Sequence, residues 1–193
     1  DFGESAGSRF LTMEYVPGTT LREVIDARGG LQLTPALQIA KQVCRGLAAV
    51  HKAGIIHGDL KPQNVMVMGN GVAKLMDFGV ARTRSNQDHG GVSVVGTPLY
   101  MSPEQAKGAD LDERSDIYSA GVMMYEMFTG QCPFKAKEVA EILQMHLNDT
   151  PADPRTIRPE IPAPLAEIIL ACLSKHRAQR PGSAVDLDRW LMR

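Results

Sequence analysis

The stretch "HGDLKPQN", residues 57–64, decides the fold because it gathers acidic, basic and amide side chains within a few positions. It holds Asp59, Lys61 and Asn64. The segment before it repeats apolar residues with the period of a helix and ends at Gly54. The stretch itself has no such period, so we expect a loop that presents these three side chains together.

A predicted hairpin connects this loop to a second acidic motif. The sequence "VMVMGNGVAKLM", residues 65–76, indicates two short strands around a Gly-Asn-Gly turn. The second strand runs directly into "DFG", residues 77–79, which should place Asp77 beside Asp59 and Asn64 at the mouth of the hairpin. Phosphoryl transfer from a nucleotide uses such a set. One carboxylate orients the attacking hydroxyl, a cation neutralises developing charge, and a carboxylate and an amide oxygen bind Mg²⁺.

Composition and charge exclude several kinds of partner. The 193 residues are 44% hydrophobic, and 21 Lys and Arg against 22 Asp and Glu give a net charge of −1. Without a basic excess we expect no nucleic-acid partner. No apolar run approaches the roughly 18–20 residues that span a bilayer, so we expect no membrane segment in this chain.

The three cysteines, Cys44, Cys132 and Cys172, lie far apart in apolar periodic stretches. Their odd number and wide spacing indicate reduced core residues of an intracellular protein rather than a disulfide framework. We therefore expect a cytoplasmic location, with the alternative that a segment outside this chain tethers the parent protein to a membrane.

Before the long helix, the pattern predicts a hairpin and a short helix. The sequence "RFLTMEYV", residues 9–16, indicates a strand, and turn residues before it indicate a β-hairpin over residues 1–15. Thr20 and Glu23 match a capping box, which should start a helix that ends at Gly29-Gly30.

The long helix should have Thr34 as its N-cap and Pro35 at its first helical position. Residues 83–97 are polar and rich in glycine, which indicates a long surface loop. Beyond this loop the periodicity predicts four helices, at roughly residues 112–129, 136–148, 164–175 and 183–192.

Six motifs in this order resemble the C-terminal lobe of a eukaryotic-type protein kinase, especially the serine/threonine kinases found in bacteria. They are "MEYV" for the nucleotide hinge, "HGDLKPQN" for the catalytic loop, "DFG" for the metal loop, "GTPLYMSPE" for the end of the activation segment, "DIYSAG" for a buried central helix, and "RAQRP" for an arginine near the C-terminus. The resemblance covers residues 10–193. It implies an α+β, protein-kinase-like fold, with a mostly helical C-lobe at 16–193 and a remnant of the N-lobe at 1–15.

The resemblance assigns roles to the residues of the central loop. Asp59 is expected to be the catalytic base and Lys61 the cation near the transferred phosphoryl group. Asn64, which completes the catalytic set, and Asp77 would share the metal, Mg²⁺ or alternatively Mn²⁺. Thr97 would brace Asp59 where the substrate enters. A lysine within "DLKPQN" is the serine/threonine-type form, so the expected partner is a protein substrate with a Ser or Thr acceptor.

The resemblance also implies an ATP site. Met13 resembles the gatekeeper, while Glu14 and Val16 would offer backbone groups to adenine. Met66 would pack beneath the base. An alternative interpretation of Met66 is a plain hairpin core residue, because the core and the floor under adenine are the same apolar surface.

Five other residues resemble structural positions of the family. His57 would stack under Phe78 of the metal loop instead of taking part in acid–base chemistry. Glu104 and Arg180 resemble a buried ion pair that ties the activation segment to the helical body. Asp116 resembles the helix residue that receives backbone N–H groups from the catalytic loop. The other histidines show no partner in the sequence and are expected at the surface or at helix ends: His51, His89, His146 and His176.

Two features depart from the family pattern. Gly58 stands where the family usually has an arginine that pairs with a phosphate in the activation loop, which makes this a non-RD sequence. We therefore predict that the loop at 80–97 is not switched on by phosphorylation in the usual way. In addition, no glycine-rich loop, strand lysine or partner glutamate precedes the hinge, so the isolated chain should be almost inactive. The strand at residues 10–15 would then present an unpaired apolar edge, and self-association through that edge is expected.

Two rival functions stay open beside the kinase. One is a pseudokinase that acts as a binding scaffold, which the retained Asp59, Asn64 and Asp77 disfavour. The other is a small-molecule phosphotransferase of the aminoglycoside or choline kinase type, which shares the sequence "HGD" with this chain. Lys61, "DFG" and "SPE" are the protein-kinase forms at the positions where such enzymes differ.

Overall fold

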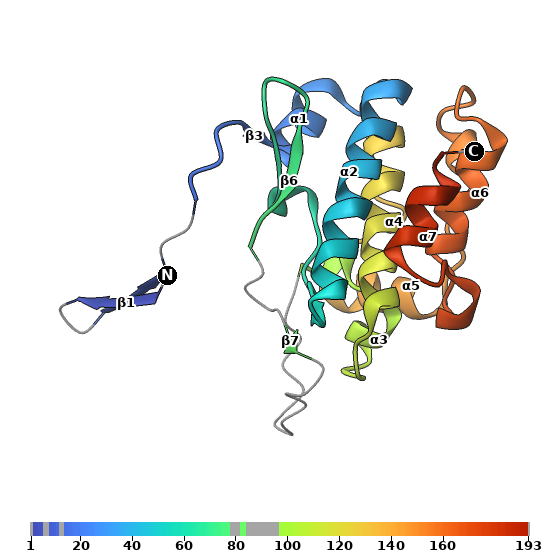
Figure 1. The fold of residues 1–193 in the computed structure, drawn as a ribbon. Helices are drawn as coiled ribbons and strands as arrows, with labels where there is room; N and C mark the ends of the chain where they lie inside the picture. Colours follow the sequence, from blue (N-terminus) through green and yellow to red (C-terminus); the bar gives the residue numbers. More distant parts are fainter. Residues whose placement is uncertain (1, 6–7, 12–13, 78–81, 84–96, 193) are drawn as a thin grey trace.

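The computed structural model describes residues 2–5, 8–11, 14–77, 82–83 and 97–192, with side chains described in 14–77 and 97–192. A body of packed helices has a small antiparallel sheet at one side (Figure 1). The helices are α1 (Leu21–Arg28), α2 (Leu33–Lys52), α3 (Pro103–Ala106), α4 (Glu113–Thr129), α5 (Val139–Asn148), α6 (Ala163–Cys172) and α7 (Ala184–Trp190). The strands are β1 (Phe2–Ser5), β2 (Ser8–Leu11), β3 (Thr19–Thr20), β4 (Ile55–Ile56), β5 (Val65–Val67), β6 (Ala73–Leu75) and β7 (Arg82–Thr83). This arrangement confirms the predicted α+β class.

Helix α4 is the centre of the helical body. Every residue from Ser115 to Phe128 is buried, as expected of a helix that other elements surround on all sides. Helices α2 and α6 pack against it. A Cβ atom at Gly121 would lie 2.6 Å from the Cβ of Cys172 on α6, so the close approach of these two helices requires glycine at position 121.

All three cysteines are buried free thiols, which confirms the prediction that they are core residues. Burial raises the pKa of Cys44 to about 12 and that of Cys132 also to about 12. Both thiols therefore stay protonated at neutral pH and contribute to packing rather than to chemistry.

Helix α1 begins and ends where the sequence predicts. Thr20 Oγ1 accepts the N–H of Glu23 at 3.2 Å, and Glu23 Oε2 accepts the N–H of Thr20 at 2.7 Å, which completes the capping box. Gly29 ends the helix with φ of +62°, a conformation that glycine adopts without a steric penalty. Strand β3, which includes Thr20 itself, was not expected from the sequence.

The predicted start of α2 is wrong by a few residues. The helix begins at Leu33 with Gln32 as N-cap, and no side chain caps it. Thr34 therefore lies inside the first turn. Pro35 is tolerated there because the first four N–H groups of a helix have no partner within it.

The sheet of β3, β5 and β6 contains the predicted hairpin. Strands β5 and β6 pair antiparallel, with Val65 opposite Leu75, and the N–H of Met68 donates to the carbonyl of Val72 at 2.8 Å across the turn. Strand β3 pairs with the other edge of β5. A Cβ at Gly46 of α2 would lie 2.9 Å from Leu75 Cδ1, so this glycine lets the hairpin pack closely on α2.

The N-terminal strands form the predicted hairpin but end early. Strands β1 and β2 pair antiparallel with Phe2 opposite Leu11, and Figure 1 shows them standing away from the helical body. The expected strand at residues 9–16 is wrong at its end, because residues 14–16 belong to no strand. A short pair of β4 with β7 reaches Thr83, within the segment expected to be a loop.

The later helices differ from the predictions mainly at their ends. Helix α4 fits its predicted range, and Asp112 caps it by accepting the N–H of Arg114 at 2.9 Å. Helix α5 begins three residues late and α6 ends three residues early. Helix α3 was missed, although Ser102 and Gln105 form a capping box that is a signal in the sequence.

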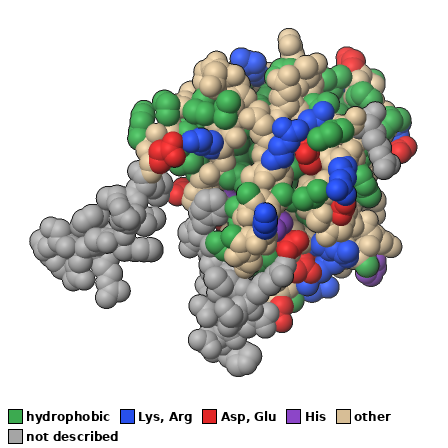
Figure 2. Space-filling model, viewed as in Figure 1, with side chains coloured by type: hydrophobic (Ala, Val, Ile, Leu, Met, Phe, Trp, Pro, Cys, Tyr) green, Lys and Arg blue, Asp and Glu red, His purple; other side chains and the backbone are tan. Residues whose placement is uncertain are grey.

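The surface carries charges of both signs. On the face drawn in Figure 2, Lys and Arg side chains are interspersed with Asp and Glu, in keeping with the net charge of −1. Within the part of the chain that the structure describes, no helix has the length and apolar character needed to cross a bilayer.

Candidate active site

The buried carboxylate of Asp116 holds the backbone of the loop at residues 57–64. Asp116 lies on α4 and is 1% exposed. Its Oδ2 accepts the N–H of His57 at 2.9 Å, and its Oδ1 accepts the N–H of Gly58 at 2.8 Å. His51 of α2 brings its Nε2 to 2.7 Å from Oδ2. The loop conformation is therefore fixed by two helices of the core, through a single side chain.

The ring of His57 is buried, and both of its nitrogens face backbone groups. The N–H of Asp59 points at Nδ1 at 3.3 Å, so Nδ1 accepts. The Nε2 lies 3.3 Å from the carbonyl oxygen of Met76, to which it must donate. This arrangement places His57 between the loop and the strand leading to Asp77. Phe78, its expected stacking partner, lies outside the described residues.

Asp59 is the point at which the polar side chains of the site meet. Lys61 Nζ lies 2.6 Å from Asp59 Oδ2 and 2.8 Å from Thr97 Oγ1. The N–H of Thr97 donates to Asp59 Oδ1 at 3.3 Å. Asn64 Nδ2 donates to the Asp59 carbonyl at 2.9 Å and to Oδ2 at 3.3 Å. Both carboxylate oxygens are held, which fixes the plane of the carboxylate.

Asn64 and Asp77 fit the chemistry of a hard divalent cation. With its Nδ2 donating to Asp59, the amide oxygen of Asn64 is the atom left for a ligand role. The N–H of Met76 donates to the Asn64 carbonyl at 2.8 Å, which brings the residue before Asp77 against Asn64. Asp77 is exposed and has φ of +52°, a left-handed conformation that is uncommon outside glycine and often found at functional sites.

The residues expected at the nucleotide lie around β5 and β6. Met66 on β5 is half-buried and stands opposite Lys74 of β6. Lys74 Nζ pairs with Glu14 Oε1 at 2.9 Å, so the segment after the N-terminal hairpin runs beside this strand. Val16 is buried, at 8% exposure. Met13 lies outside the described residues.

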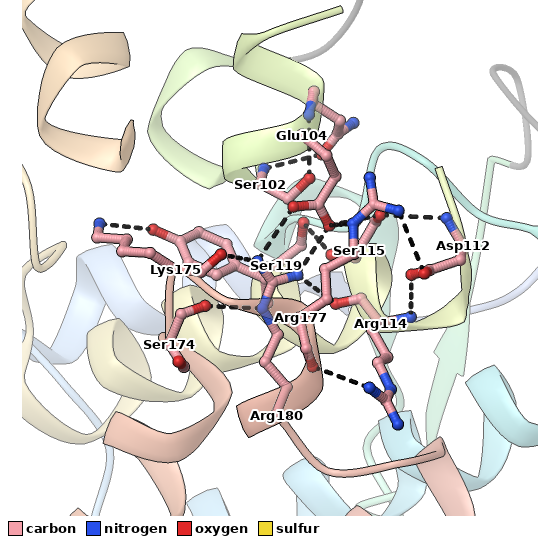
Figure 3. Close-up of polar contacts among 12 residues, drawn as sticks. Ser102, Glu104, Asp112, Arg114, Ser115, Ser119, Ser174, Lys175, Arg177 and Arg180 are labelled. Atoms are coloured by element: carbon pink, nitrogen blue, oxygen red, sulfur yellow. Dashed lines mark hydrogen bonds and ion pairs between the residues drawn. The ribbon is translucent and has the colours of Figure 1, made fainter. Parts of the chain in front are cut away.

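A buried ion pair anchors the segment that follows Thr97. Glu104 of α3 accepts two hydrogen bonds from Arg180: Nη1 donates to Oε1 at 2.7 Å and Nη2 donates to Oε2 at 3.0 Å. Figure 3 shows the two side chains meeting beside Ser115, whose hydroxyl donates to Oε1 at 2.6 Å. Burial alone raises the pKa of Glu104, but the bonds from Arg180 and Ser115 outweigh it and keep the pKa below its usual 4.5.

Arg180 also donates to backbone carbonyls around the pair. They belong to Arg114 at 2.9 Å, Ser174 at 2.8 Å and Lys175 at 3.3 Å. Its guanidinium carbon lies 4.9 Å from the centre of the Tyr118 ring. The donors of this buried side chain are thus matched with acceptors, as a charge removed from water requires.

The chain matches the family model described as "Protein kinase domain" over residues 1–189. It belongs to the protein kinase family. The protein-kinase-like fold predicted from the sequence motifs is therefore confirmed.

Curated relatives of this chain come from several bacteria. "Serine/threonine-protein kinase pkn3" of Myxococcus xanthus is 39% identical, over 95% of this chain and 36% of its own length. "Probable serine/threonine-protein kinase CPE1738" of Clostridium perfringens is 37% identical, over 97% of this chain and 27% of its own length. "Serine/threonine-protein kinase PknB" of Mycobacterium tuberculosis is 34% identical, over 95% of this chain and 30% of its own length. The chain thus spans about a third of the length of these relatives.

The chain has a second buried polar cluster, which the sequence did not reveal. Glu126 of α4 pairs with Arg22 of α1 at 2.7 Å and accepts the hydroxyl of Tyr100 at 2.5 Å. Burial, then the neighbouring Cys132 and Glu126, raise the pKa of Tyr100, so its hydroxyl stays a donor. Tyr100 follows Thr97 closely, and the cluster therefore fixes the same segment from its other side. These partners are too far apart in the sequence to form a local motif.

Two of the histidines expected at the surface or at helix ends lie in the last turns of α2 and α5, and both are buried. His51 binds Asp116, and His146 of α5 is 0% exposed. His146 Nε2 lies 3.2 Å from the Leu99 carbonyl, and its Nδ1 lies 2.9 Å from the Tyr118 hydroxyl. The helix-end positions of His51 and His146 agree with the prediction, whereas their burial and their partners, which come from distant parts of the chain, were not predicted. His176 is exposed, as expected, and His89 lies outside the described residues.

The buried His146 should make the folded protein sensitive to acid. Burial and the nearby Lys175 lower its pKa from 6.5 to about 4. The unfolded chain therefore binds a proton at a pH where the folded protein does not, and stability present above pH 6.5 is lost as the pH falls towards 4. Between these values we expect the wild type to lose about 1 kcal/mol more per pH unit than His146→Gln.

Urea unfolding at pH 7, 6 and 5 measures this difference in slope. His176→Gln is the matched control, because the exposed His176 should leave the slope of the wild type unchanged. Equal pH slopes for the wild type and His146→Gln would rule out His146 as the source of the acid sensitivity.

Proposed function

We propose that this chain carries the phosphotransfer centre of a serine/threonine protein kinase that uses ATP and Mg²⁺. The observation that carries the proposal is the contact of Lys61 with both Asp59 and Thr97, at 2.6 Å and 2.8 Å. This contact brings a carboxylate base, a cation and the residue at the expected substrate entry to one point. The serine/threonine-protein kinases among the relatives support the same reaction class.

In the proposed reaction, Asp59 accepts a hydrogen bond from the acceptor hydroxyl of a protein substrate and takes its proton as the oxygen attacks phosphorus. Lys61 neutralises part of the negative charge that develops on the transferred group. The N–H of Thr97 and the amide of Asn64 keep the carboxylate in one orientation, so the acceptor meets it at a fixed angle.

Asn64 and Asp77 are the proposed metal-binding residues, because an amide oxygen and a carboxylate are ligands that Mg²⁺ accepts. Bound Mg²⁺, or Mn²⁺ in its place, would neutralise charge on the phosphates of ATP. For adenine we propose an apolar contact with Met66 and backbone hydrogen bonds from Glu14 and Val16. A cytoplasmic location is proposed because such compartments supply ATP and keep thiols like Cys44 reduced.

The test uses the protein expressed from its complete coding sequence. We expect it to transfer phosphate from ATP to Ser- and Thr-containing peptides, to act poorly on the matching Tyr peptides, and to stop when EDTA removes the metal. Nucleotide binding by equilibrium dialysis is measured in parallel. Binding of ATP without transfer to any peptide would contradict the proposal and favour a pseudokinase scaffold.

A further inference from the structure

Gln105 of α3 uses both ends of its side-chain amide. Its Oε1 accepts the N–H of Ser102 at 2.9 Å and so caps α3. Its Nε2 donates to the carbonyl oxygen of Gly58 at 2.6 Å. The same amide therefore stabilises the start of a short helix and joins that helix directly to the catalytic loop.

The carbonyl of Gly58 and the N–H of Asp59 belong to the same planar peptide group. The N–H of this peptide points at His57 Nδ1 at 3.3 Å, and its oxygen accepts from Gln105 at 2.6 Å. Gly58 has φ of +74°, a conformation that side chains disfavour, and its own N–H is held by Asp116. The plane of the peptide before Asp59 is thus set by His57 on one edge and by Gln105 on the other.

Helix α3, which carries Gln105, is itself held in place by contacts with other parts of the chain. Glu104, the residue before Gln105, is fixed by its paired bonds to Arg180. At the other end of the same segment, Thr97 bonds the Asp59 carboxylate through its N–H. Segment 97–105 therefore contacts the Gly58–Asp59 unit twice, once at the carboxylate and once at the backbone.

We infer that Gln105 is a positioning residue for Asp59, and that this tie orients the catalytic loop without any phosphate. The bond uses a side-chain amide and a backbone carbonyl, neither of which requires a modification of the chain. The inference rests on the proposed function in that Asp59 is the base. It goes beyond that function by naming what holds the base in its working orientation.

The test compares three variants of the protein from its complete coding sequence. Gln105→Glu keeps an acceptor for Ser102 and a capping box, but it replaces the donor to Gly58 by a carboxylate oxygen. Ser102→Ala removes the cap and keeps the donor. Lys107→Ala changes an exposed side chain just after α3 and is the matched control.

For Gln105→Glu we expect kcat to fall on the order of 10- to 100-fold, with the KM for ATP within about twofold of the wild type. Hydrogen exchange at the amide of Asp59 should become about tenfold faster. Ser102→Ala should lower the melting temperature, and it should leave the exchange at Asp59 unchanged. Lys107→Ala should match the wild type in every measurement.

Unchanged exchange at Asp59 in Gln105→Glu would overturn the inference, whatever happens to kcat. A kcat within twofold of the wild type would overturn it as well. If the wild-type protein transferred no phosphate, the proposed function would fail. The hydrogen-exchange measurement would then still show whether Gln105 orients the peptide group between Gly58 and Asp59.

Discussion

Asp59→Asn is expected to lower the proposed kinase activity, measured as kcat on the protein from its complete coding sequence, by about a thousandfold. The amide has nearly the shape of the carboxylate, and its single oxygen can still accept the hydrogen bond from Lys61, while its NH2 group replaces the oxygen that accepted from Thr97. It cannot take a proton from the acceptor hydroxyl at neutral pH, so the loss falls on the chemical step. We expect the KM for ATP and the melting temperature to stay close to those of the wild type.

Peptide phosphorylation under saturating ATP measures this effect. Asp110→Asn is the matched control, because Asp110 is an exposed aspartate outside the site and its variant should keep wild-type kcat. A kcat for Asp59→Asn within tenfold of the wild type would show that Asp59 is not the base. The reaction would then proceed by positioning and charge neutralisation alone.

Arg180→Met is expected to reduce the free energy of unfolding by about 3–5 kcal/mol. Methionine fills much of the volume of arginine, so the main loss is electrostatic. Glu104 would be left as a buried carboxylate with the longer contact to Arg177 Nε, at 3.5 Å, in place of its bonds to Arg180, and three backbone carbonyls would lose the donor that Arg180 supplies. Urea unfolding at pH 7 measures the change, with the m-value showing whether the transition stays two-state.

The double variant Glu104→Gln/Arg180→Met tests the cause of this loss. Removal of both charges should recover part of the stability, because no stranded charge then remains. Arg189→Met is the control, since Arg189 forms an exposed ion pair with Asp186 and should change stability by less than about 1 kcal/mol. A change below 1 kcal/mol for Arg180→Met would mean that the buried pair contributes little to stability.

The sequence predicted those parts of the fold that depend on neighbouring residues. The capping box of Thr20 and Glu23 and the hairpin after Asn64 rest on local hydrogen bonds and turn geometry, and both are confirmed. The start of α2 was missed because it carries no side-chain cap, so no local signal marks Leu33. Strand β3 has only two residues, too few for a visible alternation.

The sequence motifs predicted where the candidate site lies, but they predicted only some of the contacts that hold its residues in place. The order of "HGDLKPQN" and "DFG" predicted that Asp59, Lys61 and Asn64 gather, and the structure brings them together. The contacts of Glu126 with Arg22 and of His146 with Leu99 join residues far apart in the chain. Such pairs depend on how the helices pack, which the periodicity of each helix alone does not determine.

Because Asp116 joins the helical core to the candidate site, substitutions in the core should also affect the site. The carboxylate that holds the backbone of His57 and Gly58 is carried by α4, whose residues from Ser115 to Phe128 are all buried. A substitution that shifts α4 therefore also shifts the loop that presents Asp59. The orientation of Asp59 therefore depends on the packing of the helical core as well as on the polar residues of the site. A larger side chain at Gly121, where a Cβ would lie 2.6 Å from the Cβ of Cys172, should consequently disturb this loop as well as the core.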